Sequence, residues 1–447
     1  MRHGHDRQGK FDRDRGTKTV QFGFWPGPSR TTYAQADQAM FHQKTKREIP
    51  LMNPLHRGAP VLSRMHTAAV SVLMLLSIAR PAAAEVALGP VTVGAGMQAS
   101  FFDCDKSCIY SPATINTAAG DSSVAGFALN DIRLYVNGNV TNQIKIMFNT
   151  EYTGSGSGPG ADKLEVLDAV GRFEFSDYLN IWAGRFLEPS DRANMYGPFY
   201  ANDWTPFADG VADFYPGIEN GRDNGLMYWG QFGILKAALG VFDGESTNSV
   251  VADKSKLLYA GRLMLDFWDP EAGYYLNSTY YGDKDLLAVG LAAQSQNSKN
   301  TESLDALLDK KLPNLGVLTV EAEYLHDNGL SGTTSSKGWF GLGAYLFPQV
   351  VGIGKFQVLA KYSQKTVDAG FDETIVNGFI STTPVAANKI KTLEINANYL
   401  IKPYNARVGF YYLHQKQQLN DYYYTPLAPA IGPTSAHEIG LKLQLQM

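Results

Sequence analysis

Alternation of apolar and polar residues is the feature that most constrains this chain. In residues 435–446, every second residue around Ile439 and Leu441 is apolar, and the residues between include Glu438 and Lys442. A period of two predicts a β-strand with one apolar and one polar face. The same pattern flanks the turn NVTNQ, where it predicts a hairpin. The chain is therefore expected to be all-β.

Seventeen alternating segments follow residue 88, with no convincing amphipathic helix. Short and long connections alternate between them, as periplasmic turns and extracellular loops do in outer-membrane barrels. Bacterial barrels have an even number of strands, so one of the seventeen segments is not a strand. Short and long connections alternate throughout only if 268–284, which contains the segment 273–281, is a single connection and a long loop lies near 297–301. The sixteen predicted strands are 88–102, 126–139, 142–153, 164–175, 179–187, 224–232, 234–243, 257–268, 285–296, 302–310, 316–326, 337–346, 355–366, 390–400, 404–415 and 435–446.

Two kinds of all-β fold have strands with one apolar and one charged face, and here the charged face is uniform from strand to strand. A soluble sandwich buries its apolar faces, whereas an outer-membrane barrel turns them to lipid and lines a wet lumen with polar residues. The number of strands and the two unequal sets of connections favour a 16-stranded antiparallel transmembrane β-barrel. Ile132, Leu134 and Val136 would then face lipid, and Arg133 the lumen. A secreted β-sandwich that binds or cleaves glycans is the alternative.

The first 84 residues differ from the rest. Residues 68–79 are apolar, Arg57 and Arg64 precede them, and alanines follow. This pattern predicts a signal peptide over 52–84 with cleavage after Ala84, and its apolar run is shorter than a membrane-spanning helix. Residues 1–51 are expected to be a non-native or mis-assigned extension, so the barrel domain would be 85–447.

Charge and cysteine content narrow the partners. Residues 1–84 hold 13 of the 39 basic and 5 of the 43 acidic residues, which leaves 26 and 38, a net charge of −12, for 85–447. A chain this acidic is no general binder of nucleic acid. Cys104 and Cys108 are expected to form a local disulfide in an oxidising compartment, with a free pair as the alternative. Two cysteines make a poor zinc site, so no metal or cofactor is expected.

The strand phases place basic residues in the N-terminal half of the lumen and many acids in the C-terminal half. Such walls would set up a transverse field for permeating ions, although pairing of opposite charges across strands is the alternative. The wall cations expected to line the pore are Arg133, Lys145, Arg172, Arg185, Lys236 and Arg262.

The longest connection, 188–223, is rich in aromatic residues that favour burial. We expect it to fold into the lumen as the third extracellular loop, where Arg192 and Arg222 would join the pore lining. An outward cap packed on other loops or on another subunit is the alternative. No HExxH, GxSxG or P-loop motif is present, and Glu321 with Glu323 form a pair of lumen acids rather than a glycosidase pair, so no enzyme is expected.

The stretch AGRFLEPSDRANMYGPFYANDW, with NGRDNGLMYWGQ and RLMLDFWDPEAGYYLNSTYYGDKDLLAVG, resembles the phosphate-selective porin O/P family of Gram-negative outer membranes. The resemblance spans essentially all of 85–447. It implies a sixteen-stranded, usually trimeric porin that conducts anions, with an anion path lined by basic residues of the wall and of the inward third loop. Arg185, Arg192 and Arg222 fall in the matching motifs, and Arg133 is a weaker match.

Three functions remain open. The chain is expected to be an outer-membrane porin that lets small hydrophilic solutes, above all anions such as phosphate, diffuse through the membrane, with outer-membrane lipid and small anions as its partners. A non-selective or cation-preferring porin of the same fold is favoured by the net charge. The third possibility is the secreted glycan-binding or glycan-cleaving sandwich.

Overall fold

The computed structural model describes residues 86–88, 90–105, 108–109, 124–153, 163–211, 222–244, 257–330, 334–376, 379–385, 387–420 and 434–447. The predicted signal peptide, its cleavage site and the preceding extension lie outside the described residues. No helix in the described ranges is long and apolar enough to cross a membrane.

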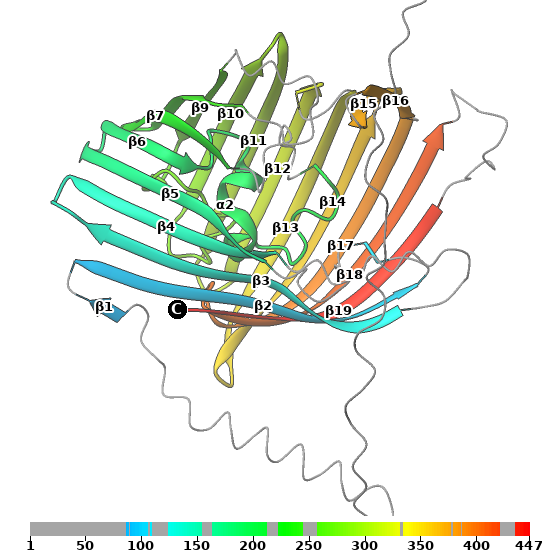
Figure 1. Cartoon of the computed structure of the whole chain (residues 1–447). Helices are drawn as coiled ribbons and strands as arrows, with labels where there is room; N and C mark the ends of the chain where they lie inside the picture. Colours follow the sequence, from blue (N-terminus) through cyan, green and yellow to red (C-terminus); the bar gives the residue numbers. More distant parts are fainter. Residues whose placement is uncertain are drawn as a thin grey trace, which may run out of the picture. The chain divides into compact units, whose positions relative to one another are not determined.

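Sixteen antiparallel strands form one closed ring (Figure 1). The ring closes because β19 pairs with β2 and β9 pairs with β10. The strands are β2 (Val91–Asp105), β3 (Val124–Asn139), β4 (Ile144–Thr153), β5 (Lys163–Ser176), β6 (Leu179–Phe186), β7 (Asp223–Phe232), β8 (Leu235–Phe242), β9 (Leu258–Asp266), β10 (Leu286–Gln296), β11 (Lys299–Leu312), β12 (Gly316–Asn328), β13 (Ser335–Val351), β14 (Gly354–Val367), β17 (Ala387–Lys402), β18 (Ala406–Asn420) and β19 (Thr434–Gln446).

Three further strands are not among the sixteen that form the ring. β1 (Val86–Leu88) adds a short antiparallel strand to β2. β15 (Gly370–Val376) and β16 (Phe379–Val385) form a separate hairpin in the connection between β14 and β17. The one helix of the described residues, α2 (Arg192–Tyr200), lies inside the ring (Figure 1).

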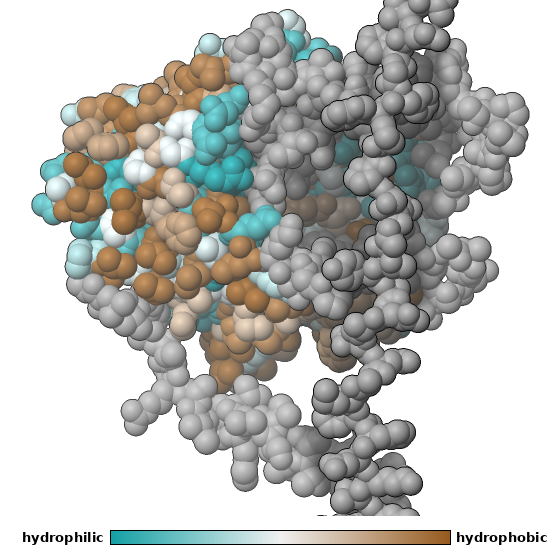
Figure 2. All heavy atoms as spheres, viewed as in Figure 1, coloured by the Kyte–Doolittle hydropathy of each residue, from teal (hydrophilic) through white to brown (hydrophobic). Residues whose placement is uncertain are grey.

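Burial along the strands is inverted relative to a soluble protein. On β19, Lys442 is 1% exposed, whereas the neighbouring Leu441 is 53% exposed. On β3, Arg133 is 9% exposed and Leu134 is 39% exposed. Apolar residues accordingly gather on the outer surface over the strands (Figure 2). Alternation with apolar residues outward is the pattern of a transmembrane barrel, and it confirms the faces predicted for these residues of β3 and β19.

The strand predictions agree with the structure except at one connection. Each of the sixteen predicted segments overlaps one strand of the ring, and 268–284 contains no strand, as the loop alternation predicts. The long loop expected near 297–301 is wrong. β10 and β11 are joined by Asn297 and Ser298, both with positive φ, because two such residues form the tight hairpin turn whose twist matches the strands.

Candidate pore and its lining

The β6–β7 loop crosses the interior of the ring in its described part, residues 187–211. α2 starts where the Asp191 side chain accepts a hydrogen bond from the backbone nitrogen of Asn194. It kinks at Gly197, which has φ 60° and precedes Pro198. These capping and kinking residues turn the chain across the lumen. Residues 212–221 lie outside the described part, so the fold of the whole loop stays a prediction.

Side chains of distant strands hold this loop. Gln98 of β2 donates to the carbonyl oxygen of Pro198 (3.1 Å), and Gln444 of β19 donates to that of Phe199 (3.0 Å). Lys442 of β19 donates to the carbonyl oxygen of Trp204 (2.7 Å). These strands lie on another part of the ring from β6 and β7, so the loop is anchored across the lumen.

The acids of the C-terminal wall anchor the same loop. Glu323 accepts from the backbone nitrogen of Ala193 (3.1 Å), and Glu394 accepts from that of Trp204 (2.9 Å). Lys361 of β14 completes the attachment by binding Asp203 at 3.0 Å. Both glutamates are 3% exposed. They therefore bind loop backbone rather than face an open channel, unlike the acidic wall expected from the sequence.

A second segment also enters the lumen, from the other rim. Ser278 of the β9–β10 connection, residues 267–285, donates to the Glu321 carboxylate of β12. Backbone hydrogen bonds join this connection to the β6–β7 loop, from Leu276 N to Met195 O (3.3 Å) and from Ser278 N to Tyr200 O (3.2 Å). Nothing in the sequence pattern indicated that this connection would fold inward.

A buried ion cluster locks the two segments together. Arg192 is 0% exposed; it binds the Glu271 carboxylate and donates to the carbonyl oxygen of Asn277 at 2.9 Å. Its Nε also lies 3.4 Å from the carboxylate of Asp305, which Arg262 contacts at 2.6 Å. Burial opposes the charge of Glu271, but Arg192 outweighs it and holds the pKa of that carboxyl below its usual range.

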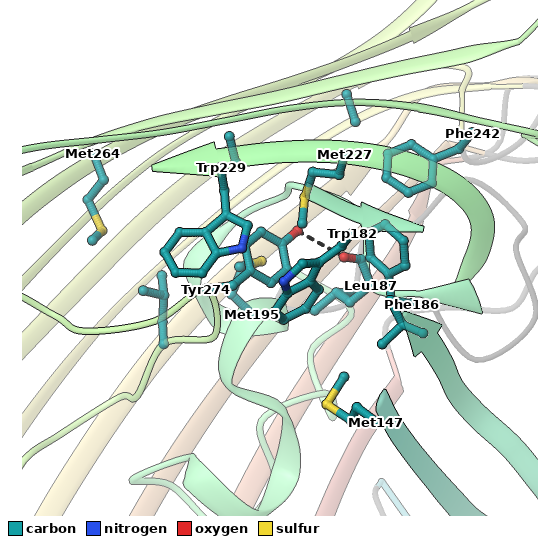
Figure 3. Close-up of a cluster of buried hydrophobic side chains, with 14 of the residues drawn as sticks. Met147, Trp182, Phe186, Leu187, Met195, Met227, Trp229, Phe242, Met264 and Tyr274 are labelled. Carbon is teal, nitrogen blue, oxygen red and sulfur yellow. Dashed lines mark hydrogen bonds between the residues drawn. The ribbon is translucent and has the colours of Figure 1, made fainter. Parts of the chain in front are cut away.

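An apolar cluster fills the lumen against β6–β9 (Figure 3). Trp182 packs edge-on against Tyr274 with ring centroids 5.1 Å apart. The Tyr274 hydroxyl donates to the carbonyl oxygen of Leu187 (2.8 Å), which ties the β9–β10 connection to the β6–β7 loop. The other labelled members are Met147, Phe186, Met195, Met227, Trp229, Phe242 and Met264.

Open space lies along the adjoining wall, on β2–β5. A cavity of about 380 Å³, here named the arginine cavity, is bounded by these strands, by α2 and by residues 275–277, and both Arg133 and Arg222 line it. A second cavity of about 710 Å³, here named the turn-side cavity, extends to the turn at Asp177. Tyr275 lines both cavities, so it stands between them.

The predicted pore cations divide between open and packed positions. Arg133 and Arg222 line the arginine cavity, and Lys145 and Arg172 line the turn-side cavity. Each has a nearby carboxylate. Arg133 binds Glu151 at 2.8 Å and Arg222 binds Asp168 at 3.1 Å, while Glu174 binds Lys145 at 2.7 Å and lies 3.8 Å from Arg172.

The other four predicted cations line neither of these two cavities. Arg192 and Arg262 belong to the buried ion cluster, and Lys236 donates to the carbonyl oxygen of Glu271. Arg185 pairs in register with the exposed Ala169, on the face of β6 opposite the buried Trp182 and Phe186. The lumen position expected for Arg185 is therefore wrong, because the unbroken alternation along β6 puts Arg185 on the same outward face as Ile181 and Ala183.

Cys104 and Cys108 are joined by a disulfide at the end of β2. Glu438 lies beside them and accepts from the backbone nitrogen of Ile109 (2.7 Å). The three side chains have the composition of a small metal-binding group, but the disulfide occupies both sulfurs. The structure thus contains the local disulfide expected for a chain in an oxidising compartment.

Comparisons with solved structures return outer-membrane proteins. OprB of Pseudomonas putida matches with a TM-score of 0.52 at 10% identity, over 80% of this chain and 94% of that one. The outer membrane channel DcaP of Acinetobacter baumannii matches with a TM-score of 0.49 at 14% identity, over 82% and 100%. An anion-selective porin from Comamonas acidovorans matches with a TM-score of 0.48 at 14% identity, over 80% and 99%.

The fold and the lumen define the class. The chain is a sixteen-stranded antiparallel barrel with the architecture of outer-membrane porins. No protein-family model matches the sequence, and no curated protein matches it. At 10% identity, the likeness to OprB supports the fold alone. The narrower resemblance to phosphate-selective O/P porins therefore stays a prediction.

Proposed function

We propose that this chain is a porin of a Gram-negative outer membrane that lets small hydrophilic solutes diffuse passively, anions such as phosphate in preference to cations. The supporting observation is that Arg133 and Arg222 both reach the arginine cavity, with Asp168 as the only acidic side chain among its lining residues. Cationic side chains at a constriction favour anions.

The hydrogen bonding of Arg133 supports the same preference. Its Nε and Nη2 donate to Glu151 at 3.3 and 2.8 Å. Nη1 makes no hydrogen bond within the described residues and lies 3.4 Å from the position that a Cβ on Gly197 would take. A guanidinium donor in this position can bind a phosphate or carboxylate oxygen.

A cation-preferring pore is the second candidate, since Glu151 and Asp168 lie beside the two arginines and residues 85–447 carry a net charge of −12. The reversal potential of the mature protein in a planar bilayer under a KCl gradient separates the two. We expect a reversal potential shifted toward the chloride equilibrium potential. A shift toward the potassium equilibrium potential would reject anion preference and leave the barrel intact.

Two variants test which charges set the preference. Arg133→Gln and Arg222→Gln should each move the reversal potential toward the potassium equilibrium potential, because each substitution leaves a carboxylate beside the cavity without its cation. Lys391→Gln is the matched control. Lys391 lies on the outward face of β17, next to the inward-facing Thr392, so this variant removes one positive charge without changing the lumen. An equal shift in all three variants would show that net charge, and not the cavity, sets selectivity.

The proposal includes export and assembly. Export would remove residues 52–84, and N-terminal sequencing of protein from outer membranes should begin at Glu85. Assembly as a homotrimer, which the family resemblance implies, predicts a threefold protein mass in light scattering of the detergent-solubilised protein. A monomeric mass would reject the trimer without affecting the pore.

A further inference from the structure

The arginine cavity is chemically two-sided. Arg133 and Arg222 supply guanidinium groups, whereas Leu187, Met195 and Met147 supply apolar surface. These three apolar residues belong to the buried cluster of Figure 3, which therefore reaches the cavity from the β6–β7 loop and β4.

Aromatic rings complete the apolar side. Tyr196 of α2 and Tyr275 of the β9–β10 connection both line the arginine cavity. The ion pair between Arg192 and Glu271 holds these two segments together, so the rings are carried on anchored backbone. A preformed, mostly apolar lining with a few charged groups is the usual arrangement of a small-molecule site, and about 380 Å³ lies within the size range of such sites.

Inorganic phosphate fits only half of this lining. A phosphate ion can accept hydrogen bonds from the arginines, but beside methionine and leucine it loses water without gaining a partner. An organic anion with an apolar body satisfies both sides, because its carboxylate binds a guanidinium while its body removes apolar surface from water.

We propose that the arginine cavity is a binding site for organic anions with a carboxylate on an aromatic or other apolar body, and that Tyr275 is a specificity-determining residue on their route to the turn-side cavity. This inference rests on the proposed function, since it names the anions that the pore would take. It assigns Met195, Leu187 and Tyr275 a role in solute choice in addition to packing.

Block of single-channel KCl current in planar bilayers tests the proposal. Benzoate is the probe, inorganic phosphate the anion without an apolar body, and benzyl alcohol the ring without a charge. Benzoate should reduce the current at a concentration about tenfold lower than phosphate, because partial burial of one ring contributes roughly that factor. Benzyl alcohol should have little effect, because it lacks the carboxylate.

Met195→Gln should remove most of the difference between benzoate and phosphate, since it makes the wall polar at nearly constant length. Met227→Gln is the matched control, because Met227 belongs to the same buried cluster but does not line the arginine cavity. Tyr275→Asn provides a second test at a half-buried position. This variant should weaken benzoate block and also raise the KCl conductance. Heat-dependent gel migration checks that each variant folds.

Equal block by benzoate and phosphate would overturn the inference, as would a benzoate preference that survives both Met195→Gln and Tyr275→Asn. These outcomes are distinct from failure of the proposed function. A reversal potential on the potassium side would reject anion preference, and the benzoate–phosphate comparison would still decide whether the cavity binds organic anions.

Discussion

Arg192 and Arg133 carry the same guanidinium group, but their surroundings give them different roles. Arg192 is 0% exposed and lies between the carboxylates of Glu271 and Asp305. Arg133 binds one carboxylate, Glu151, and reaches the arginine cavity. A buried arginine neutralised by two carboxylates offers no net positive charge to a solute. Arg192 is therefore a structural residue, and Arg133 is a candidate for the anion path.

Glu188 gives a prediction about pH at the same scale. It is 0% exposed, and burial raises the pKa of its carboxyl well above the usual range, with nearby Asp223 adding to the effect and Arg222 opposing it. An unfolded glutamate titrates near about 4.3. Above that pH the folded chain keeps a proton that the unfolded chain releases, so this residue's contribution to stability falls as pH rises.

Glu188→Gln should therefore flatten the pH dependence, because glutamine stays neutral at every pH. The measurement is the temperature at which the folded band disappears from gels, recorded across a pH series for the unchanged protein and the variant. The variant should gain stability relative to the unchanged protein as pH rises above about 4.3. Glu302→Gln, at an exposed carboxyl of β11, is the control. A constant difference between Glu188→Gln and the unchanged protein would contradict the prediction.

At the scale of elements, the sequence predicts strands far better than it predicts the paths of connections. Period-two alternation is local, so each strand of the ring could be found from its own residues. The turn at Asn297 and Ser298 was missed because it lacks the Asn-Gly or Asp-Gly signal that normally marks so tight a hairpin.

The inward path of the β9–β10 connection could not be read from the sequence for a different reason. Its direction depends on partners distant in the chain; Arg192 and Glu271 are 79 positions apart. Gly273 and Pro270 show that a turn is possible, but not where it goes. For the same reason, the sequence could not separate Arg192 and Arg262, which are buried in ion pairs, from Arg133 and Arg222, which line the cavity.

Removing the ion pairs that join the β6–β7 loop to the β9–β10 connection should make both segments more mobile. Arg192→Met leaves Glu271 and Asp305 buried without this partner, a change that typically costs about 3–5 kcal/mol. We expect a lower temperature of heat-dependent unfolding and larger fluctuations of the open-channel current. Lys391→Met is the control, because Lys391 makes no ion pair within the described residues. Quiet current with unchanged thermal stability in Arg192→Met would show that the ion cluster does not hold the segments.

At the scale of the whole molecule, the inverted burial pattern assigns the two surfaces of the ring. The outward residues of β19, such as Leu441 and Leu445, are 53% and 44% exposed, and the inward Gln444 is 0% exposed. In water this arrangement would leave an apolar belt uncovered, at a large cost in hydration free energy. In a bilayer the same belt is covered by lipid, and the inward polar groups find partners in the two anchored segments.

This assignment predicts how stability depends on membrane depth. Leu441→Arg, in the middle of β19, should lower the free energy of unfolding by about 2–4 kcal/mol in lipid vesicles, because the cation would face the hydrocarbon core. Leu445→Arg, next to the last residue of β19, should cost only about 0–1 kcal/mol, because the side chain can reach the interface. Urea unfolding of both variants in vesicles measures the difference. Equal costs at the two positions would mean that the outward face does not meet a bilayer, and the inverted burial would then need another partner to cover it.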